Sequence, residues 1–379
     1  MGRVIQKDTT VFASVEDMID RLRPSYPVNC LWPRVLRDSA ARFVKSFPGD
    51  VLYAVKCNPH PTVLQAMYDG GIRHFDTASL AEIGLIGEMF PDATAYYHHP
   101  VKSRAMIETA KSVWGIRHYA LDHMDELDKV IEKAGKDAIA VVRVQTPKTD
   151  AVFDLAAKFG APPETAVTIL RAAAAAGLKT GICFHVGSQC RTPSAYSDAV
   201  AVAGKVIRDA GVDPVVFDVG GGFPVDYVNS PAPALDLYFD AIKQSYAALG
   251  IANCNLICEP GRALVAEGQS LVVQVLLRKD CKLYINDGVY GSLTDLKASG
   301  LVMPARLIRP NEKPADLFDD FTIFGPTCDS VDVLPETWRL PADVREGDWI
   351  EVGTLGAYSN ALASQFNGFA AETFVEIEN

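Results

Sequence analysis

Short β-forming runs alternate with helical stretches along the first two thirds of the chain. The β-forming runs are Val51–Val55, Ile72–Phe75, Ala95–Tyr97, His118–Leu121, Ile139–Val144, Gly181–Val186, Val215–Val219 and Leu256–Cys258. The helical stretches are Pro61–Tyr68, Leu80–Met89, Ser103–Ser112, Met124–Ala134, Thr165–Leu178 and Ser194–Asp209. Strands that alternate with helices pair in parallel. About eight such units favour a closed (β/α)₈ TIM-like barrel over an open sheet.

The pattern changes after Gly261, where strands follow one another with few helices between them. These strands are Leu271–Leu277, Cys281–Asn286, Ala305–Arg309, Asp320–Phe324, Trp349–Val352 and Thr373–Ile377. A chain of 379 residues exceeds one average domain, and a barrel needs only ~250 residues. We therefore predict an α/β barrel domain over residues 30–265. Residues 266–379 form a β-rich domain, sandwich-like or barrel-like, and residues 1–29 are grouped with it.

Composition argues against several classes of protein. The net charge of −11 disfavours a nucleic-acid-binding surface. No run approaches the ~18 apolar residues of a membrane span, and Met1–Ser14 lacks the pattern of a signal peptide. The eight cysteines are scattered without the recurring spacing of a zinc site, which is typical of a reducing compartment. We expect a cytoplasmic enzyme without nucleic-acid or membrane partners.

Polar residues stand where several predicted strands end. The residues in question are Lys56, Asp76, Arg143, His185, Ser188, Glu259 and Arg262. Catalytic groups of a barrel come from the carboxyl ends of its strands, so we expect these side chains to share one site. The adjacent pair His98 and His99 could suggest a metal, but neighbouring residues point apart and no third ligand stands near. We predict no metal.

Lys56 follows the apolar run Val51–Val55. A surface lysine is the ordinary alternative, but this run is too apolar for a solvated edge. We expect burial to lower the pKa of the amine and make it a nucleophile toward an aldehyde.

Two glycine-containing segments have both an ordinary and a functional interpretation. Gly220–Gly222 could be a simple turn, or its exposed amides could bind phosphate. Glu259–Arg262 could be a turn in which Arg262 pairs with Glu259, or Arg262 could bind phosphate as a two-pronged donor. In the later loops, Cys328 is the thiol least typical of core packing, and Tyr358 could be an ordinary buried tyrosine.

Seven segments together resemble a known family. They are Tyr53–Asn58, Phe75–Ser79, Phe184–Ser188, Asp218–Pro224, Glu259–Arg262, Gly325–Asp329 and Gly356–Tyr358. In this order they resemble the ornithine/lysine decarboxylase branch of the fold-type III, alanine-racemase-like decarboxylases, which use pyridoxal 5′-phosphate (PLP). The resemblance covers nearly the whole chain and implies a barrel with a β domain. It also implies a head-to-tail homodimer with shared active sites.

The resemblance implies roles for matching positions. Lys56 would hold PLP as a Schiff base, His185 would stack on its ring, and Glu259 would pair with the ring nitrogen. The remaining cofactor contacts would be Asp76, Arg143, Ser188, Gly221, Gly222, Gly261, Arg262 and Tyr358, of which Ser188, Gly222, Arg262 and Tyr358 would bind phosphate.

On the substrate side, Cys328 would direct reprotonation, and Asp329 would meet the distal amine. Both would reach across from the partner subunit. Asp287 would be a second acidic contact, and Tyr284 and Phe366 would complete the substrate site.

The implied reaction is decarboxylation of L-ornithine, L-lysine or both to putrescine or cadaverine and CO₂, as in polyamine biosynthesis. Diaminopimelate, arginine, carboxynorspermidine or a D-amino acid are alternative substrates, and racemisation and a non-catalytic regulatory role are further alternatives. No arginine is clearly placed for a distal carboxylate, which disfavours diaminopimelate. The segment Ser359–Leu362 departs from the family pattern, so the size of the substrate stays open.

Overall fold

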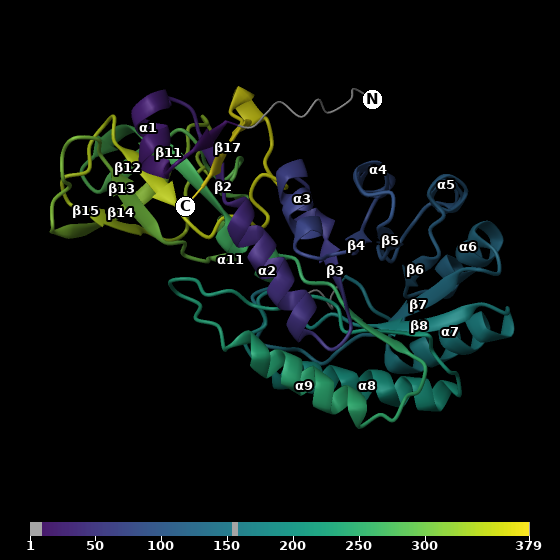
Figure 1. Ribbon diagram of the computed structural model, residues 1–379. Coiled ribbons are helices and arrows are strands. Elements are labelled where there is room, and N and C mark those ends of the chain that lie inside the picture. Colours follow the sequence, from purple (N-terminus) through teal and green to yellow (C-terminus); the bar gives the residue numbers. More distant parts are fainter. Residues whose placement is uncertain (1–9, 154–157, 379) are drawn as a thin grey trace.

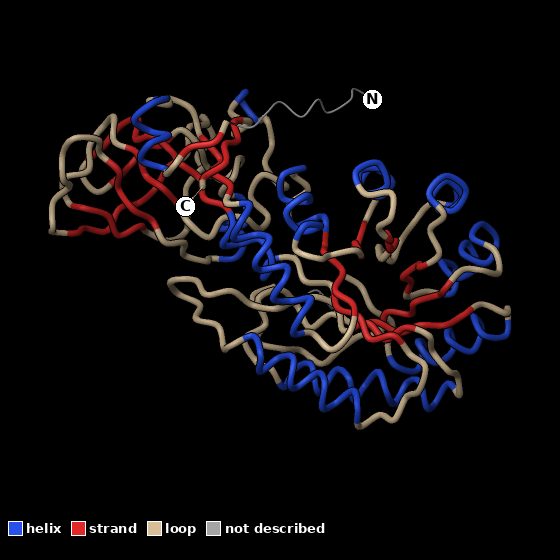
Figure 2. The backbone as a smooth tube through the Cα atoms, in the orientation of Figure 1, coloured by secondary structure: helices blue, strands red, loops and turns tan. Residues whose placement is uncertain are grey.

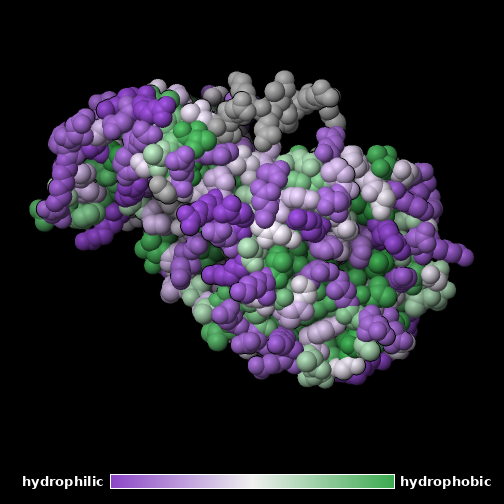
Figure 3. Space-filling model, viewed as in Figure 1, coloured by the Kyte–Doolittle hydropathy of each residue, from purple (hydrophilic) through white to green (hydrophobic). Residues whose placement is uncertain are grey.

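The computed structural model describes residues 10–153 and 158–378. Two bodies lie side by side: a barrel ringed by helices and a smaller β-rich domain (Figure 1). Apolar residues are scattered among hydrophilic ones on the face drawn in Figure 3. Within the described ranges, no helix combines the length and apolar character needed to cross a membrane.

Eight parallel strands close the barrel in the order β10-β3-β4-β5-β6-β7-β8-β9 (Figure 2). Their bounds are β3 Asp50–Ala54, β4 His74–Thr77, β5 Thr94–Tyr97, β6 His118–Leu121, β7 Ile139–Arg143, β8 Lys179–Cys183, β9 Val216–Asp218 and β10 Asn255–Cys258. The helices around it are α2 Pro33–Ser46, α3 Pro61–Asp69, α4 Leu80–Met89, α5 Arg104–Trp114, α6 Met124–Ala134, α7 Pro163–Ala175, α8 Ser194–Ala210 and α9 Leu235–Ala247. The predicted barrel is confirmed.

Local chemistry explains where the barrel helices begin and end. The hydroxyls of Ser79 and Ser103 accept from backbone amides in the first turns of α4 and α5. Proline opens α2, α3 and α7, where its missing N–H costs nothing. Gly115 and Gly211 end α5 and α8 in the left-handed conformation.

Alternation along each strand separates two apolar layers. Leu52, Val141 and Ile257 belong to a small buried cluster that also contains Tyr96, Ala120 and Val216 from other barrel strands. Their chain neighbours, such as Tyr53, belong to the main core cluster, which also includes buried faces of the surrounding helices. Successive side chains of a strand point to opposite faces, so a barrel strand needs apolar residues on both.

The second domain is a nine-stranded mixed sheet with the path β1-β17-β2-β11-β12-β14-β15, to which β16 and β13 attach through β11. The strands are β1 Val11–Phe12, β2 Val28–Leu31, β11 Gln269–Lys279, β12 Lys282–Ile285, β13 Ala305–Ile308, β14 Phe318–Phe324, β15 Trp338–Pro341, β16 Trp349–Val352 and β17 Thr373–Ile377. Short helices accompany them and the domain junction: α1 Val15–Leu22, α10 Arg262–Val265, η2 Ala266–Gly268, α11 Thr294–Ser299 and η3 Phe366–Gly368.

A network of amides fastens the β domain to the barrel beside Lys56. Asn58, just after β3, donates to Gln269 Oε1 at 2.8 Å and to the carbonyl of Gly356 at 2.9 Å. Gln269 in turn donates to Asn29 Oδ1 at 2.9 Å. The Tyr358 amide donates to the carbonyl of Cys57 at 2.9 Å. These contacts bring a β-domain loop to the mouth of the barrel.

Candidate active site

A cavity of about 290 Å³ opens at the carboxyl ends of the barrel strands. All eleven residues predicted to contact the cofactor line it: Lys56, Asp76, Arg143, His185, Ser188, Gly221, Gly222, Glu259, Gly261, Arg262 and Tyr358. Ten belong to the barrel or its junction, and Tyr358 comes from the β domain. The barrel geometry thus brings together side chains that are up to 302 residues apart (Lys56 to Tyr358).

Lys56 lies in a short 3₁₀ turn, η1 Val55–Cys57, directly after β3. Its Nζ is 2.5 Å from Oδ2 of Asp76, which belongs to the neighbouring strand β4. Desolvation beside the cavity lowers the pKa of the amine, but the carboxylates of Asp76 and then Glu259 outweigh it and raise that pKa above its usual value. The predicted burial and the predicted fall in the pKa were both wrong: the Lys56 side chain is 45% exposed, and its sequence neighbours did not reveal the carboxylate opposite.

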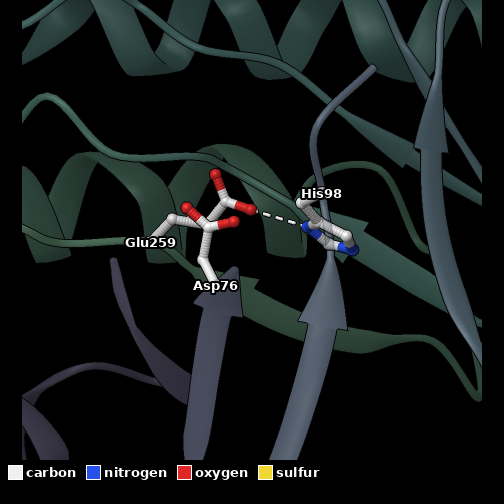
Figure 4. Close-up of side chains that lie close together, drawn as sticks. All are labelled: Asp76, His98 and Glu259. Atoms are coloured by element: carbon white, nitrogen blue, oxygen red, sulfur yellow. Dashed lines mark hydrogen bonds and ion pairs between the residues drawn. The ribbon is translucent and has the colours of Figure 1, made fainter. Parts of the chain in front are cut away.

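Glu259 follows β10 and points toward Asp76 and His98 (Figure 4). Its Oε1 is 2.6 Å from Nδ1 of His98, and that nitrogen is also 3.3 Å from Oδ2 of Asp218. Burial and then the charge of Asp218 raise the pKa of Glu259, while the hydrogen bond from His98 lowers it. His98 was not predicted as a site residue. The available signal was its position after the run Ala95–Tyr97, like the other strand-end residues.

The glycine turn after β9 is closely packed. A Cβ on Gly222, whose φ is +105°, would lie 2.3 Å from the carbonyl oxygen of Gly187. A Cβ on Gly221 would lie 2.5 Å from the carbonyl oxygen of Glu259. Only glycine fits these two positions, and it leaves the backbone bare toward the cavity, as phosphate binding requires.

Arg262 is buried beside this turn. Its Nη1 is 2.9 Å from Asp295 Oδ2 and 3.1 Å from the hydroxyl of Tyr227, and its Nε is 3.4 Å from Ser188 Oγ. The guanidinium lies 5.1 Å from the ring centre of Tyr358. Its ion-pair partner is therefore Asp295, not the Glu259 that one interpretation suggested. Cation, hydroxyls and glycine backbone fit a phosphate group.

His185 lies two residues beyond β8, and its Nδ1 accepts from the amide of Gly187 at 3.0 Å. Burial, followed by the charges of Arg143 and Lys56, holds the pKa of His185 well below its usual value. The ring is therefore neutral near pH 7, which suits stacking against a flat aromatic group.

Cys328 is exposed and Asp329 partly exposed on the loop after β14, and neither lines the cavity of its own chain. Asp329 Oδ2 accepts from the Tyr290 hydroxyl at 2.6 Å, and the Tyr290 ring contacts that of Phe366 with centres 4.6 Å apart. Cys328 Sγ is 3.4 Å from Asn367 Oδ1.

Two other predicted substrate residues lie apart from the cavity. Asp287 is buried, and its carboxylate accepts from the amides of Gly288 and Ser292, at 2.7 and 3.2 Å for Oδ1. The structure thus gives Asp287 the role of stabilising a turn. Tyr284 stacks on Phe324 with ring centres 5.0 Å apart.

The donor atoms of Asp76, His98 and Glu259 lie within 4.8 Å of one another, a spacing that a metal ion could use. Lys56 and His98 already provide positive charge next to these carboxylates. The grouping is accounted for without an ion, and the absence of a metal stays a prediction.

Comparisons with known proteins agree with this arrangement. Residues 34–266 match the family model described as "Pyridoxal-dependent decarboxylase, pyridoxal binding domain". The lysine/ornithine decarboxylase of Selenomonas ruminantium is 34% identical over 329 residues, covering 84% of this chain and 81% of that protein.

Two solved structures share the whole fold. The arginine decarboxylase of Paramecium bursaria Chlorella virus, bound to agmatine, superposes with a TM-score of 0.86 at 27% identity and covers 96% of this chain and 99% of its own. The lysine/ornithine decarboxylase of Vibrio vulnificus, complexed with putrescine, gives 0.82 at 28% identity, with coverage of 97% and 99%.

Proposed function

The chain belongs to the fold-type III pyridoxal-dependent decarboxylases, in the ornithine/lysine branch, and from this premise we propose that it converts L-ornithine, L-lysine or both to the diamine and CO₂. It is a PLP-dependent amino-acid decarboxylase. The observation that carries the proposal is the single cavity in which Lys56, Glu259 and the glycine turn face one another.

Each cavity residue has a task that its geometry supports. The Lys56 amine would hold the cofactor, and the neutral His185 ring would cover it. Arg262, Ser188, Tyr358 and the backbone at Gly222 would bind phosphate.

When bound, PLP supplies an electron sink for the electrons released as CO₂ leaves. Glu259 would accept a hydrogen bond from the ring nitrogen and keep a proton on that atom. Asp76 orients the Lys56 ammonium at 2.5 Å. Of the other cofactor contacts, Arg143 and Gly261 complete the wall of the cavity.

We place the substrate contacts across a homodimer interface. Cys328 and Asp329 do not line their own cavity, yet Cys328 is exposed and Asp329 partly so. Large apolar side chains are also 41–50% exposed, at Val331 in the same loop and at Leu362, Phe366 and Phe369 in the segment whose Asn367 contacts Cys328. Exposed apolar surface of this kind marks interaction sites. A second copy of the chain would cover them and receive the Cys328 thiol as the proton donor to the reacting carbon.

The negative charge of Asp329 favours a substrate with a cationic side chain. The hydrogen bond from Tyr290 lowers the pKa of the Asp329 carboxyl, so this group carries a negative charge near pH 7. Such a carboxylate would pair with a distal ammonium and would be left unpaired by a neutral side chain.

The test is CO₂ release from a panel of L- and D-ornithine, L- and D-lysine, arginine and diaminopimelate. We expect the L-forms of ornithine and lysine to react fastest. Lys56→Ala should lose both the visible absorbance of bound PLP and the activity. Full activity and absorbance in that variant would exclude the proposal, and a preference for diaminopimelate would exclude the substrate assignment to Asp329.

A further inference from the structure

His98 is buried between two carboxylates at the mouth of the barrel. Its side chain is 2% exposed, with Nδ1 2.6 Å from Oε1 of Glu259 and 3.3 Å from Oδ2 of Asp218. Asp218 is fully buried at the end of β9, and Glu259 follows β10. His98 itself follows β5, so three separate strands bring the imidazole and both acids together.

The charge of Asp218 disfavours a second negative charge on Glu259. Burial, and then the negative charge of Asp218, raise the pKa of Glu259. A protonated Glu259 could not serve as the anionic partner of a protonated ring nitrogen. An imidazolium at 2.6 Å from Glu259 opposes this and favours the ionised carboxylate.

The charges around His98 favour its charged form. A neutral ring with its proton on Nδ1 would donate the same hydrogen bond to Glu259, so the hydrogen bond alone does not select the imidazolium. Among the described residues Nε2 has no hydrogen-bond partner, with or without the second proton. The two states differ in the positive charge of the ring, which both carboxylates attract. Burial lowers the pKa of His98, but the contacts with Asp218 and Glu259 outweigh burial and raise that pKa to about 10.

The other groups around His98 do not reverse its preference for the charged form. The His118 ring on β6 has its centre 6.5 Å away, and burial lowers the pKa of His118 to about 3, so it is neutral. Tyr96 on β5 meets the His98 ring edge-on at 5.4 Å. Asp76 on β4 adds a third carboxylate, and the Lys56 ammonium lies against it.

We propose that His98 is a positioning residue: as an imidazolium held by Glu259 and Asp218, it keeps Glu259 ionised and oriented toward the ring nitrogen of PLP. This inference rests on the proposed role of Glu259. No chemical step is assigned to His98 itself.

The charge of His98 can be measured in the enzyme freed of PLP. The chain has seven histidines, so long-range ¹H–¹⁵N spectra of ¹⁵N-histidine-labelled protein resolve each ring. We expect one imidazolium that persists from pH 7 to near pH 10 and is missing in His98→Asn. Neutral-ring signals from His98 at pH 7 would overturn the inference. This readout is independent of activity, so it separates failure of this inference from failure of the proposed reaction.

Two variants separate charge from hydrogen bonding. His98→Asn can leave a neutral amide near the position of Nδ1, and His98→Ala removes the donor altogether. We expect His98→Asn to lower kcat about tenfold with KM little changed, and to move the acidic limb of the kcat–pH profile up by about one pH unit. The affinity for PLP, measured by absorbance titration, should fall most in His98→Ala.

His118→Asn is the matched control. It changes another histidine of the barrel interior, whose Nδ1 has no partner among the described residues. We expect a wild-type pH profile and wild-type PLP affinity in this control. An unchanged acidic limb and kcat in His98→Asn would overturn the inference. If His98→Ala fails to fold, His98→Asn and the wild-type spectra still test whether His98 is charged and keeps Glu259 ionised.

Discussion

Arg262 and Asp295 form a buried ion pair that joins the barrel to the β domain. The Nη1–Oδ2 distance is 2.9 Å, and the side chains are only 3% and 6% exposed. Asp295 lies in α11, and Arg262 opens α10 at the domain junction. The carboxylate holds the guanidinium in place with Nε toward Ser188 and the cavity.

We expect Arg262→Met to destabilise the protein by about 3–5 kcal/mol, because it leaves Asp295 buried without a partner. Arg262→Met combined with Asp295→Asn should recover a large part of that loss, while PLP binding stays impaired. Urea unfolding measures the stability of the single and the double variant. Arg21→Met, at the exposed pair of Arg21 and Asp17, is the control and should cost less than about 1 kcal/mol. If the double variant lost as much stability as Arg262→Met and Asp295→Asn lose separately when added together, the ion pair would not be the cause of the loss.

Asp76→Asn should lower the pKa of Lys56, because the Asp76 carboxylate is the largest influence that raises it. The rate at which PLP attaches to the cofactor-free enzyme would then reach its half-maximum at least about one pH unit lower. Stopped-flow absorbance follows this step. Asp50→Asn, at the opposite end of the barrel strands, should leave the profile unchanged. The same midpoint in Asp76→Asn and wild type would show that Asp76 does not control Lys56.

Gly222→Ala should abolish tight PLP binding, because its Cβ would lie 2.3 Å from the carbonyl oxygen of Gly187. Gly211→Ala is a matched control: Gly211 also has a positive φ, of +67°, but a Cβ there meets nothing within 4 Å. The control should lose about 1 kcal/mol of stability and bind PLP normally. Equal PLP affinity in both variants would argue against phosphate binding at this turn.

His60 should make folding sensitive to mild acid. Burial lowers the pKa of His60 to about 4, below the 6.5 of a free histidine, and its ring stacks on Phe374 with centres 4.1 Å apart. The associated stability is fully present above about pH 6.5 and is lost as the pH falls through about 4.

His60→Asn keeps a side chain that can accept from the amide of Thr62 at the start of α3. Between pH 7 and pH 4.5 it should lose roughly 2 kcal/mol less stability than wild type. Urea midpoints at the two pH values check this. If wild type and His60→Asn lost equal stability between the two pH values, the acid sensitivity would come from groups other than His60.

Mixing Lys56→Ala with Cys328→Ala chains tests the shared sites. Half of the dimers formed would be mixed, and each would hold one intact site, so about a quarter of the wild-type activity should return. Lys56→Ala mixed with the double variant Lys56→Ala/Cys328→Ala forms no intact site and should stay inactive. No recovery despite proven exchange of chains would place Cys328 and Lys56 of one site in the same subunit.

The barrel and its cavity were predictable because strand ends in a barrel converge, whichever strand supplies them. Strand-end positions therefore sufficed to group residues such as Lys56, Asp76 and Glu259, whereas Tyr358, on a β-domain loop, was expected at this cavity only through the family resemblance. The sequence did not separate His98 from His99, because the two are identical and adjacent. In the fold, His98 meets Glu259, whereas the His99 ring packs edge-on against Phe159 at 5.5 Å.

Features that depend on contacts formed only in the folded chain could not be predicted from the sequence. β2 was not predicted, since its partners β11 and β17 lie more than 230 residues further on. The pairing of Val28–Leu31 with them places these residues in the mixed sheet, whereas the predicted barrel domain began at residue 30. Asp287 was predicted as a substrate ligand because the family resemblance implied that role. Its neighbouring amides, which occupy the carboxylate, become visible only in the folded turn.

The parallel pairing of β17 with β1 and β2 also bears on protein synthesis. Thr373–Ile377 lies between the two earliest strands of the described chain, so this part of the sheet stays open until the ribosome has synthesised these residues. The barrel can form earlier, as N-terminal units do during synthesis. Tyr358 also emerges late, and it completes the cavity. A nascent or prematurely terminated chain could thus hold Lys56 in a folded barrel without a finished cofactor pocket.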